Sequence, residues 1–155
     1  MSDFRVRAIT LDAQSVAPRS QQIEQERSVA ITDLLADNFF QPRNSLRGPY
    51  DLVLSVAEHR LVFDIAADAA EKIRVQLSLN PFRGTIRDYF LICDSHYKAM
   101  RTAQPHQIEA LDMGRRALHD EGATHLRKRL EGKIETDFAT ARRLFTLICV
   151  LHLKA

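Results

Sequence analysis

Residues 50–79 read YDLVLSVAEHRLVFDIAADAAEKIRVQLSL, and they contain the clearest periodic pattern in the chain. Apolar residues alternate with other residues in three runs, which is typical of strands that bury one face. Only short segments separate the runs, so consecutive strands are expected to pair as hairpins. The stretch therefore predicts a three-stranded antiparallel meander. Its apolar positions are Leu52, Leu54 and Val56, then Leu61, Phe63 and Ile65, then Ile73, Val75, Leu77 and Leu79.

The opposite face of this meander is polar, and it can either meet solvent or receive a partner. A further strand is predicted at residues 4–11 (FRVRAITL), which gives an antiparallel sheet of three or four strands. The residues of the polar face are Ser55, Asp64, Arg74, Gln76 and Ser78.

Helical spacing of apolar residues predicts most of the other elements. A first helix runs from Ser20 to about Asn38, and residues 41–49 are expected to form a loop because Pro, Gly and Asn gather there. The whole chain, residues 1–155, is thus predicted to be one α+β domain, with helices covering the sheet and a helical C-terminal half. Four later helices are predicted. The first begins at a cap on Asn80 before Pro81, and the second runs from Pro105 to an end at Gly122. The third runs from Ala123 to an end at Gly132, and the last begins at a cap on Thr136 or Asp137.

The last helix is apolar on nearly every side. Such a helix is either buried all round or meets another subunit with its outer face. This pattern is the main reason to expect a protein partner or a homo-oligomer such as a homodimer. Its apolar residues are Phe138, Leu144, Phe145, Leu147, Ile148, Val150, Leu151 and Leu153.

Composition narrows the class of protein. The 155 residues are 45% apolar and 27% charged, with a net charge of +2, which is too balanced to indicate a nucleic-acid binder. Two cysteines, Cys93 and Cys149, are too few for a disulfide scaffold. The first residues lack an apolar signal core, and no run is long enough to span a membrane. These features predict a cytoplasmic protein without membrane contact.

The segment Asp112–Gly122 (DMGRRALHDEG) is the strongest candidate site, because ionisable side chains interrupt an apolar helical stripe there. Arg115 lies within that stripe, and Asp112 and His119 lie at its edge. In one interpretation these residues and Arg116 face a cleft, where Arg115 binds an anion and His119 moves a proton. In the other, favoured interpretation, the cluster is a structural ion pair that locks the helix to another element, for example to Glu24 or Asp88.

Two weaker candidates involve cationic residues. Arg83 follows Asn80-Pro81 at a helix N-terminus, where free amides can bind an anion, although the spacing matches no phosphate loop. Residues 127–133 (RKRLEGK) form a basic segment that could contact RNA or the ribosome. That segment lacks the aromatic residues on which bases stack, and cations near a helix C-terminus are favoured anyway by the helix dipole.

Catalytic and metal-binding motifs are not apparent. No nucleophile elbow is present, and the cysteines lie on apolar stripes where thiols are usually inert. The carboxylate pairs Glu24/Glu26 and Asp120/Glu121 are interpreted as ordinary surface charges. We therefore expect neither a metal nor a cofactor. The six histidines form no close pair on one helical face: His59, His96, His106, His119, His125 and His152.

Several stretches resemble a bacterial group, uncharacterised protein family 0262 of the UPF series. The resemblance covers nearly the whole chain, and the last two stretches are the most specific. It implies a small cytoplasmic protein and supplies no mechanism and no catalytic residue. The stretches are ERSVAI (26–31), GPY (48–50), RLVFDI (60–65), SLNPFR (78–83), IEALDMGRR (108–116) and DFATARRLFTLICVLH (137–152).

Three functions stay open, and the residues favour them in the following order. The first is a non-catalytic interaction or regulatory module that associates with itself. The second is a small-anion-binding protein or enzyme that uses Asp112, Arg115, Arg116 and His119, with Arg83 as a further cation. The third is an RNA- or ribosome-associated protein that uses Arg127 to Lys133.

Overall fold

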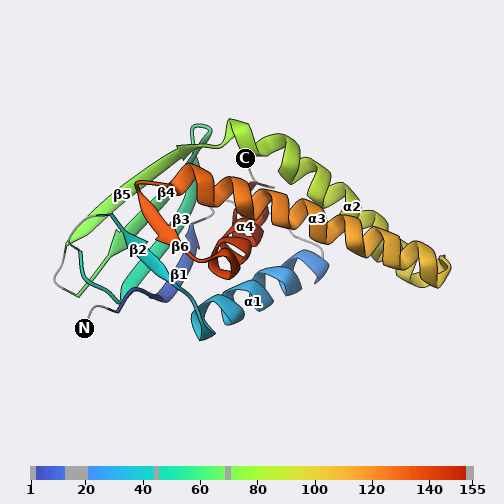
Figure 1. Ribbon diagram of the computed structural model, residues 1–155, viewed down its shortest axis with the longest axis horizontal. Coiled ribbons are helices and arrows are strands. Elements are labelled where there is room, and N and C mark those ends of the chain that lie inside the picture. Colours follow the sequence, from blue (N-terminus) through green and yellow to red (C-terminus); the bar gives the residue numbers. More distant parts are fainter. Residues whose placement is uncertain (1–2, 13–20, 44–45, 69–70, 153–155) are drawn as a thin grey trace.

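The computed structural model describes residues 3–12, 21–43, 46–68 and 71–152. It has an α+β architecture with a helical C-terminal half, as predicted (Figure 1). None of the helices in these ranges is long and apolar enough to cross a membrane. The elements in chain order are β1 (Val6–Asp12), α1 (Gln21–Ala36), β2 (Phe40–Pro42), β3 (Tyr50–Ala57), β4 (Arg60–Ala66), β5 (Lys72–Ser78), a 3₁₀ turn (Asn80–Phe82), α2 (Arg83–Thr102), α3 (Pro105–Leu130), β6 (Ile134–Thr136) and α4 (Phe138–His152).

The predicted meander is confirmed as β3, β4 and β5, which pair antiparallel in that order. Its first hairpin turns at Glu58 and His59, and both residues have positive φ, as a two-residue type I′ turn requires. The fourth strand corrects the expectation of a purely antiparallel sheet, because β1 lies parallel to β3. Parallel neighbours need a crossover connection, and α1 and β2 lie in the chain between these two strands.

A second, two-stranded sheet was not expected. Residues 40–42, partly within the predicted 41–49 loop, form β2 and pair antiparallel with β6, with Gln41 opposite Glu135. Arg43 extends the contact through an ion pair of 2.6 Å with Glu135. Three-residue strands are too short to show alternation, so only the meeting of two distant segments reveals them.

The region 105–131 also differs from the prediction, because it forms one continuous helix, α3, instead of two. Gly122 does not end a helix. It is buried inside α3, and a Cβ atom there would collide with the ring of Phe145 on α4. This glycine therefore permits close helix packing. The expected end at Gly132 is confirmed, since its φ is +80° two residues after α3 stops.

Two predicted caps have different outcomes. Asp137 caps α4, because its Oδ1 accepts a hydrogen bond of 2.8 Å from the backbone N–H of Thr140. Asn80 does not cap a helix. The chain makes a single 3₁₀ turn there before α2, and the Asn80 side chain accepts a hydrogen bond from Arg83 instead.

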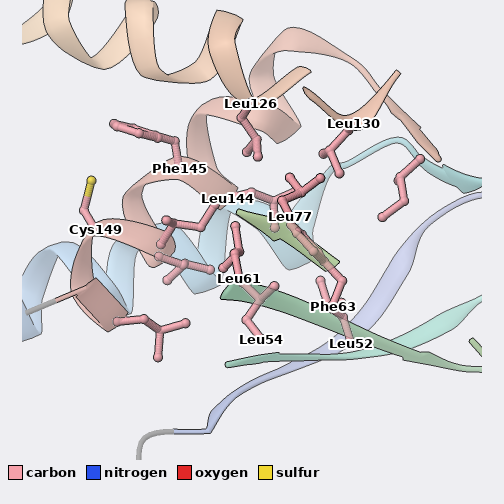
Figure 2. Close-up of a cluster of buried hydrophobic side chains, with 14 of the residues drawn as sticks. Leu52, Leu54, Leu61, Phe63, Leu77, Leu126, Leu130, Leu144, Phe145 and Cys149 are labelled. Carbon is pink, nitrogen blue, oxygen red and sulfur yellow. The ribbon is translucent and has the colours of Figure 1, made fainter. Parts of the chain in front are cut away.

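The core surrounds α4. Leu126 and Leu130 of α3 lie near Leu144 and Phe145 of α4, with the leucines of the sheet beyond (Figure 2). On its other side α4 packs against α1. The apolar residues of α4 between 144 and 151 are therefore buried within the protomer, which resolves the alternative that the sequence left open for them. Leu153 lies outside the described residues.

We expect the Gly122→Ala substitution to destabilise the protein by about 1–3 kcal/mol, because the added methyl group overpacks the contact with Phe145. Gly84→Ala is the matched control. Gly84 is also helical, but open space surrounds its Cβ position, so this substitution should stabilise the protein by about 0.5–1 kcal/mol. Chemical denaturation measures both free energies of unfolding, and similar changes in the two variants would contradict the close-packing role of Gly122.

Candidate functional site

A cleft of about 360 Å³ lies between α1, α3 and α4. α4 runs between α1 on one side and the α2–α3 hairpin on the other (Figure 1). Each helix contributes residues three or four positions apart, which share one face. The cleft therefore collects side chains from segments far apart in the sequence. Its ionisable lining residues are Glu26 and Asp33 of α1, Tyr89 of α2, Arg115 and His119 of α3, and Arg142 and Arg143 of α4.

Arg115 is half-buried and held in place by a neighbour on its own helix. Its Nη2 and Nε atoms donate to Oδ1 of Asp112 at 2.7 and 3.2 Å. These bonds hold the pKa of Asp112 below its ordinary value. Asp112 also pairs with Arg116 at 3.1 Å, but Arg116 is exposed and does not line the cleft. Arg115 is thus both ion-paired and open to the cleft.

The longer-range partners proposed for Arg115 are not the ones observed. Glu24 pairs with Arg27 at 3.4 Å, and Asp88 lies 3.7 Å from Arg87. The charge of Arg115 acts on a different carboxyl group of α1, that of Glu26, whose pKa it lowers. Arg115 therefore forms its ion pair with Asp112, which lies one turn away on the same helix and which the sequence also indicated as a partner.

His119 is neutral, and its hydrogen bonds define its tautomer. The Thr146 hydroxyl donates to the carbonyl of Arg142 at 3.2 Å, so it accepts from Nε2–H of His119 at 2.7 Å. The Nδ1 atom accepts from Nε of Arg142 at 3.4 Å. Burial, aided by the positive charge of Arg142, lowers the pKa of His119 to about 4. Because both ring nitrogens already form hydrogen bonds, His119 is better suited to a fixed position in the lining of the cleft than to proton transfer near neutral pH.

The two arginines of α4 occupy the rest of the cleft. Arg142 lies 3.2 Å from a carboxylate oxygen of Asp120 on α3. Arg143 donates to the backbone carbonyl of Asp37, just after α1, at 3.0 Å. Among the described residues, Arg143 has no carboxylate partner, so its positive charge is not balanced by a direct ion pair.

Glu26 is the site residue that sequence reasoning missed. It is half-buried in the cleft, and no hydrogen bond or ion pair ties it to the described part of the chain. Burial raises the pKa of its carboxyl group, and the charge of Arg115 offsets this only in part. The signal was present in the spacing, because Glu26 precedes the buried Ala30 and Leu34 by four and eight residues on one helical stripe.

The other predicted cations lie elsewhere. Arg83 bonds to Asn80 at 3.1 Å and to Nδ1 of His59 at 2.6 Å, and it does not line the cleft. The basic segment 127–133 has exposed cations in the last turn of α3 and just after it, where the helix dipole favours them. Its contact with RNA stays a prediction.

Cys93 and Cys149 are both buried. Burial raises the pKa of the Cys93 thiol to about 11, and it raises the pKa of the Cys149 thiol well above its ordinary value. Both thiols are therefore protonated at neutral pH and poorly nucleophilic. Within the residues that the structure describes, no group of three or more His, Cys, Asp or Glu side chains could hold a metal ion.

Comparison with known proteins shows which protein family the chain matches. The family model of the Uncharacterised protein family (UPF0262) matches residues 3–154. A UPF0262 protein of Caulobacter vibrioides (strain NA1000 / CB15N) is 59% identical over 151 residues, which cover 97% of this chain and 94% of the relative. A UPF0262 protein of Phenylobacterium zucineum (strain HLK1) is 56% identical over 148 residues, which cover 96% of this chain and 92% of the relative. No solved structure gives a significant match.

The resemblance that the sequence segments indicated is therefore confirmed over nearly the full length of the chain. The relatives carry the family name and no activity. This chain belongs to the uncharacterised protein family UPF0262, a bacterial family without an established function.

Proposed function

We propose that the cleft between α1, α3 and α4 binds a small anionic molecule. The observation that carries this proposal is the convergence of three guanidinium groups, those of Arg115, Arg142 and Arg143, on one cleft. The volume of about 360 Å³ lies at the small end of the range for ligand sites, so the ligand is a metabolite-sized molecule.

Arg115 is held in place by Asp112 and keeps donors free for an anion. A guanidinium group has five N–H donors, and the bonds of Arg115 to Asp112 use its Nε and one Nη atom. The remaining donors can contact a carboxylate or a phosphate in the cleft. Because Asp112 already fixes the side chain, little rotamer entropy is lost on binding. The proposal concerns binding and assigns no catalytic step.

We expect Arg115→Gln to weaken the binding of glutarate or inorganic phosphate at least tenfold, because a charge-assisted hydrogen bond contributes about 1.5–3 kcal/mol. Arg116→Gln is the matched control, since Arg116 shares the same Asp112 carboxylate but lies outside the cleft. Isothermal titration calorimetry of both variants measures the effect. Equal losses in the two variants, or the absence of binding to wild-type protein, would contradict the proposal.

The neutral state of His119 predicts a pH-dependent stability. Between about pH 6.5 and pH 4, the unfolded chain takes up a proton at His119 that the folded chain does not, so the free energy of unfolding falls as the pH falls. Between pH 7 and pH 5 the wild type should lose about 2 kcal/mol more than His119→Gln. Urea denaturation at both pH values provides the comparison, and parallel behaviour of the two proteins would argue against a buried neutral imidazole.

We further propose that the protein is cytoplasmic and associates with a second copy of itself, as the sequence predicts. The apolar residues of α4 no longer support self-association, because they are buried within the protomer. Support now comes from the α2–α3 hairpin, which extends away from the sheet (Figure 1) and exposes Leu91, Met100 and Met113.

Light scattering should therefore give a dimer mass, and Leu91→Glu combined with Met113→Glu should give a monomer, because each charge would be desolvated in the contact. Arg116→Gln, on the same hairpin, serves as the control and should stay dimeric. A monomer mass for the wild type at high concentration would remove this second proposal and leave ligand binding unaffected.

A further inference from the structure

The charges of the cleft are not matched in pairs. Asp112 balances Arg115, and Asp120 lies beside Arg142. Glu26 is left over, half-buried and without a hydrogen-bond or ion-pair partner in the described part of the chain. A simple anion bound to the arginines would leave this carboxylate unpartnered and add a repelling charge beside it. A ligand that satisfies the whole site must therefore also present a cationic donor.

Glu26 and Arg115 line the same cleft as Tyr89, a residue with which both interact. The charge of Arg115 lowers the pKa of the Glu26 carboxyl group and so offsets part of the effect of burial. A cation and an anion that are adjacent in the ligand can therefore meet these two side chains together. The ammonium and carboxylate groups of an α-amino acid are adjacent in this way, because both are attached to the Cα atom.

Because α1 and α4 run antiparallel, the end of α1 and the beginning of α4 together line the other end of the cleft. Arg143 contacts the carbonyl of Asp37, just after the end of α1, whereas Glu26 lies near its beginning. Asp33 lines this second end, seven residues or about 10 Å along the helix from Glu26, and its side chain is exposed to water. Arg143 has no carboxylate partner among the described residues, so it is the cation at this end that can pair with an acidic side chain of the ligand.

We propose that the cleft binds an α-amino acid, with the ligand carboxylate on Arg115 and the ligand ammonium on Glu26, and that acidic amino acids bind best. This inference rests on the proposed function, because it names the ligand of the same cleft. Glu26 acts as the residue that distinguishes an amino acid from a plain dicarboxylate.

Titration calorimetry with three compounds tests the inference. L-glutamate carries both α-groups and an acidic side chain, glutarate lacks the ammonium, and 4-aminobutyrate lacks the α-carboxylate. We expect L-glutamate to bind at least tenfold more tightly than either of the other two. In Glu26→Gln the preference for L-glutamate over glutarate should fall to less than threefold, because the amide cannot pair with the ammonium charge.

Glu24→Gln is the matched control, since Glu24 lies on the same helix outside the cleft, and this variant should keep the wild-type preference. Glu26→Gln should fold, because it removes a desolvated charge, and its melting temperature at pH 7 should equal or exceed that of the wild type. Binding of glutarate as tight as that of L-glutamate, or a preserved preference in Glu26→Gln, would overturn this inference and leave anion binding intact. Failure of all three compounds and of phosphate to bind would overturn the proposed function itself.

Discussion

The burial of α4 is the constraint on which the other parts of this structure depend. The helix is apolar on most of its circumference, so the sheet, α1 and α3 all have to cover it. One stripe of α4 is different, because Ala139, Arg142 and Thr146 follow one another at helical spacing and line the cleft instead of the core. The cleft forms where this stripe lies between α1 and α3. The burial of α4 thus determines both the packing of the core and the position of the cleft.

Close packing of α3 against α4 then sets the chemistry of the cleft. Gly122 brings the backbone of α3 against Phe145, and in the preceding turn of α3 His119 bonds to both Thr146 and Arg142 of α4. A longer side chain at residue 122 would separate the helices and break these bonds. The neutral histidine is therefore a consequence of helix packing, because the close approach that buries its ring also disfavours its charged form.

The cleft holds ionisable groups whose states are unfavourable for stability. A half-buried carboxylate without a partner lowers the free energy of unfolding relative to an apolar replacement, and an imidazole that resists protonation lowers it as the pH falls below about 6.5. Proteins commonly keep such groups where binding needs them, so their concentration in one cleft supports a binding role over a purely structural one. The ion pair of Arg115 with Asp112 is compatible with either role, because it holds the guanidinium in place and leaves donors free.

Sequence alone determined the meander, most of the helices and the α+β class, and it singled out Arg115 and His119 as candidate site residues, because these features depend on periodicity within one segment. The parallel pairing of β1, the β2–β6 sheet and the continuity of α3 through Gly122 depend on contacts between segments far apart, which local patterns do not contain. Helical spacing places Glu26 on the buried stripe of α1, but the cleft that it lines forms only where α3 and α4 pack beside that stripe. Only the tertiary structure decided which charged residues share a cleft, because burial and charge pairing are properties of the packed helices together.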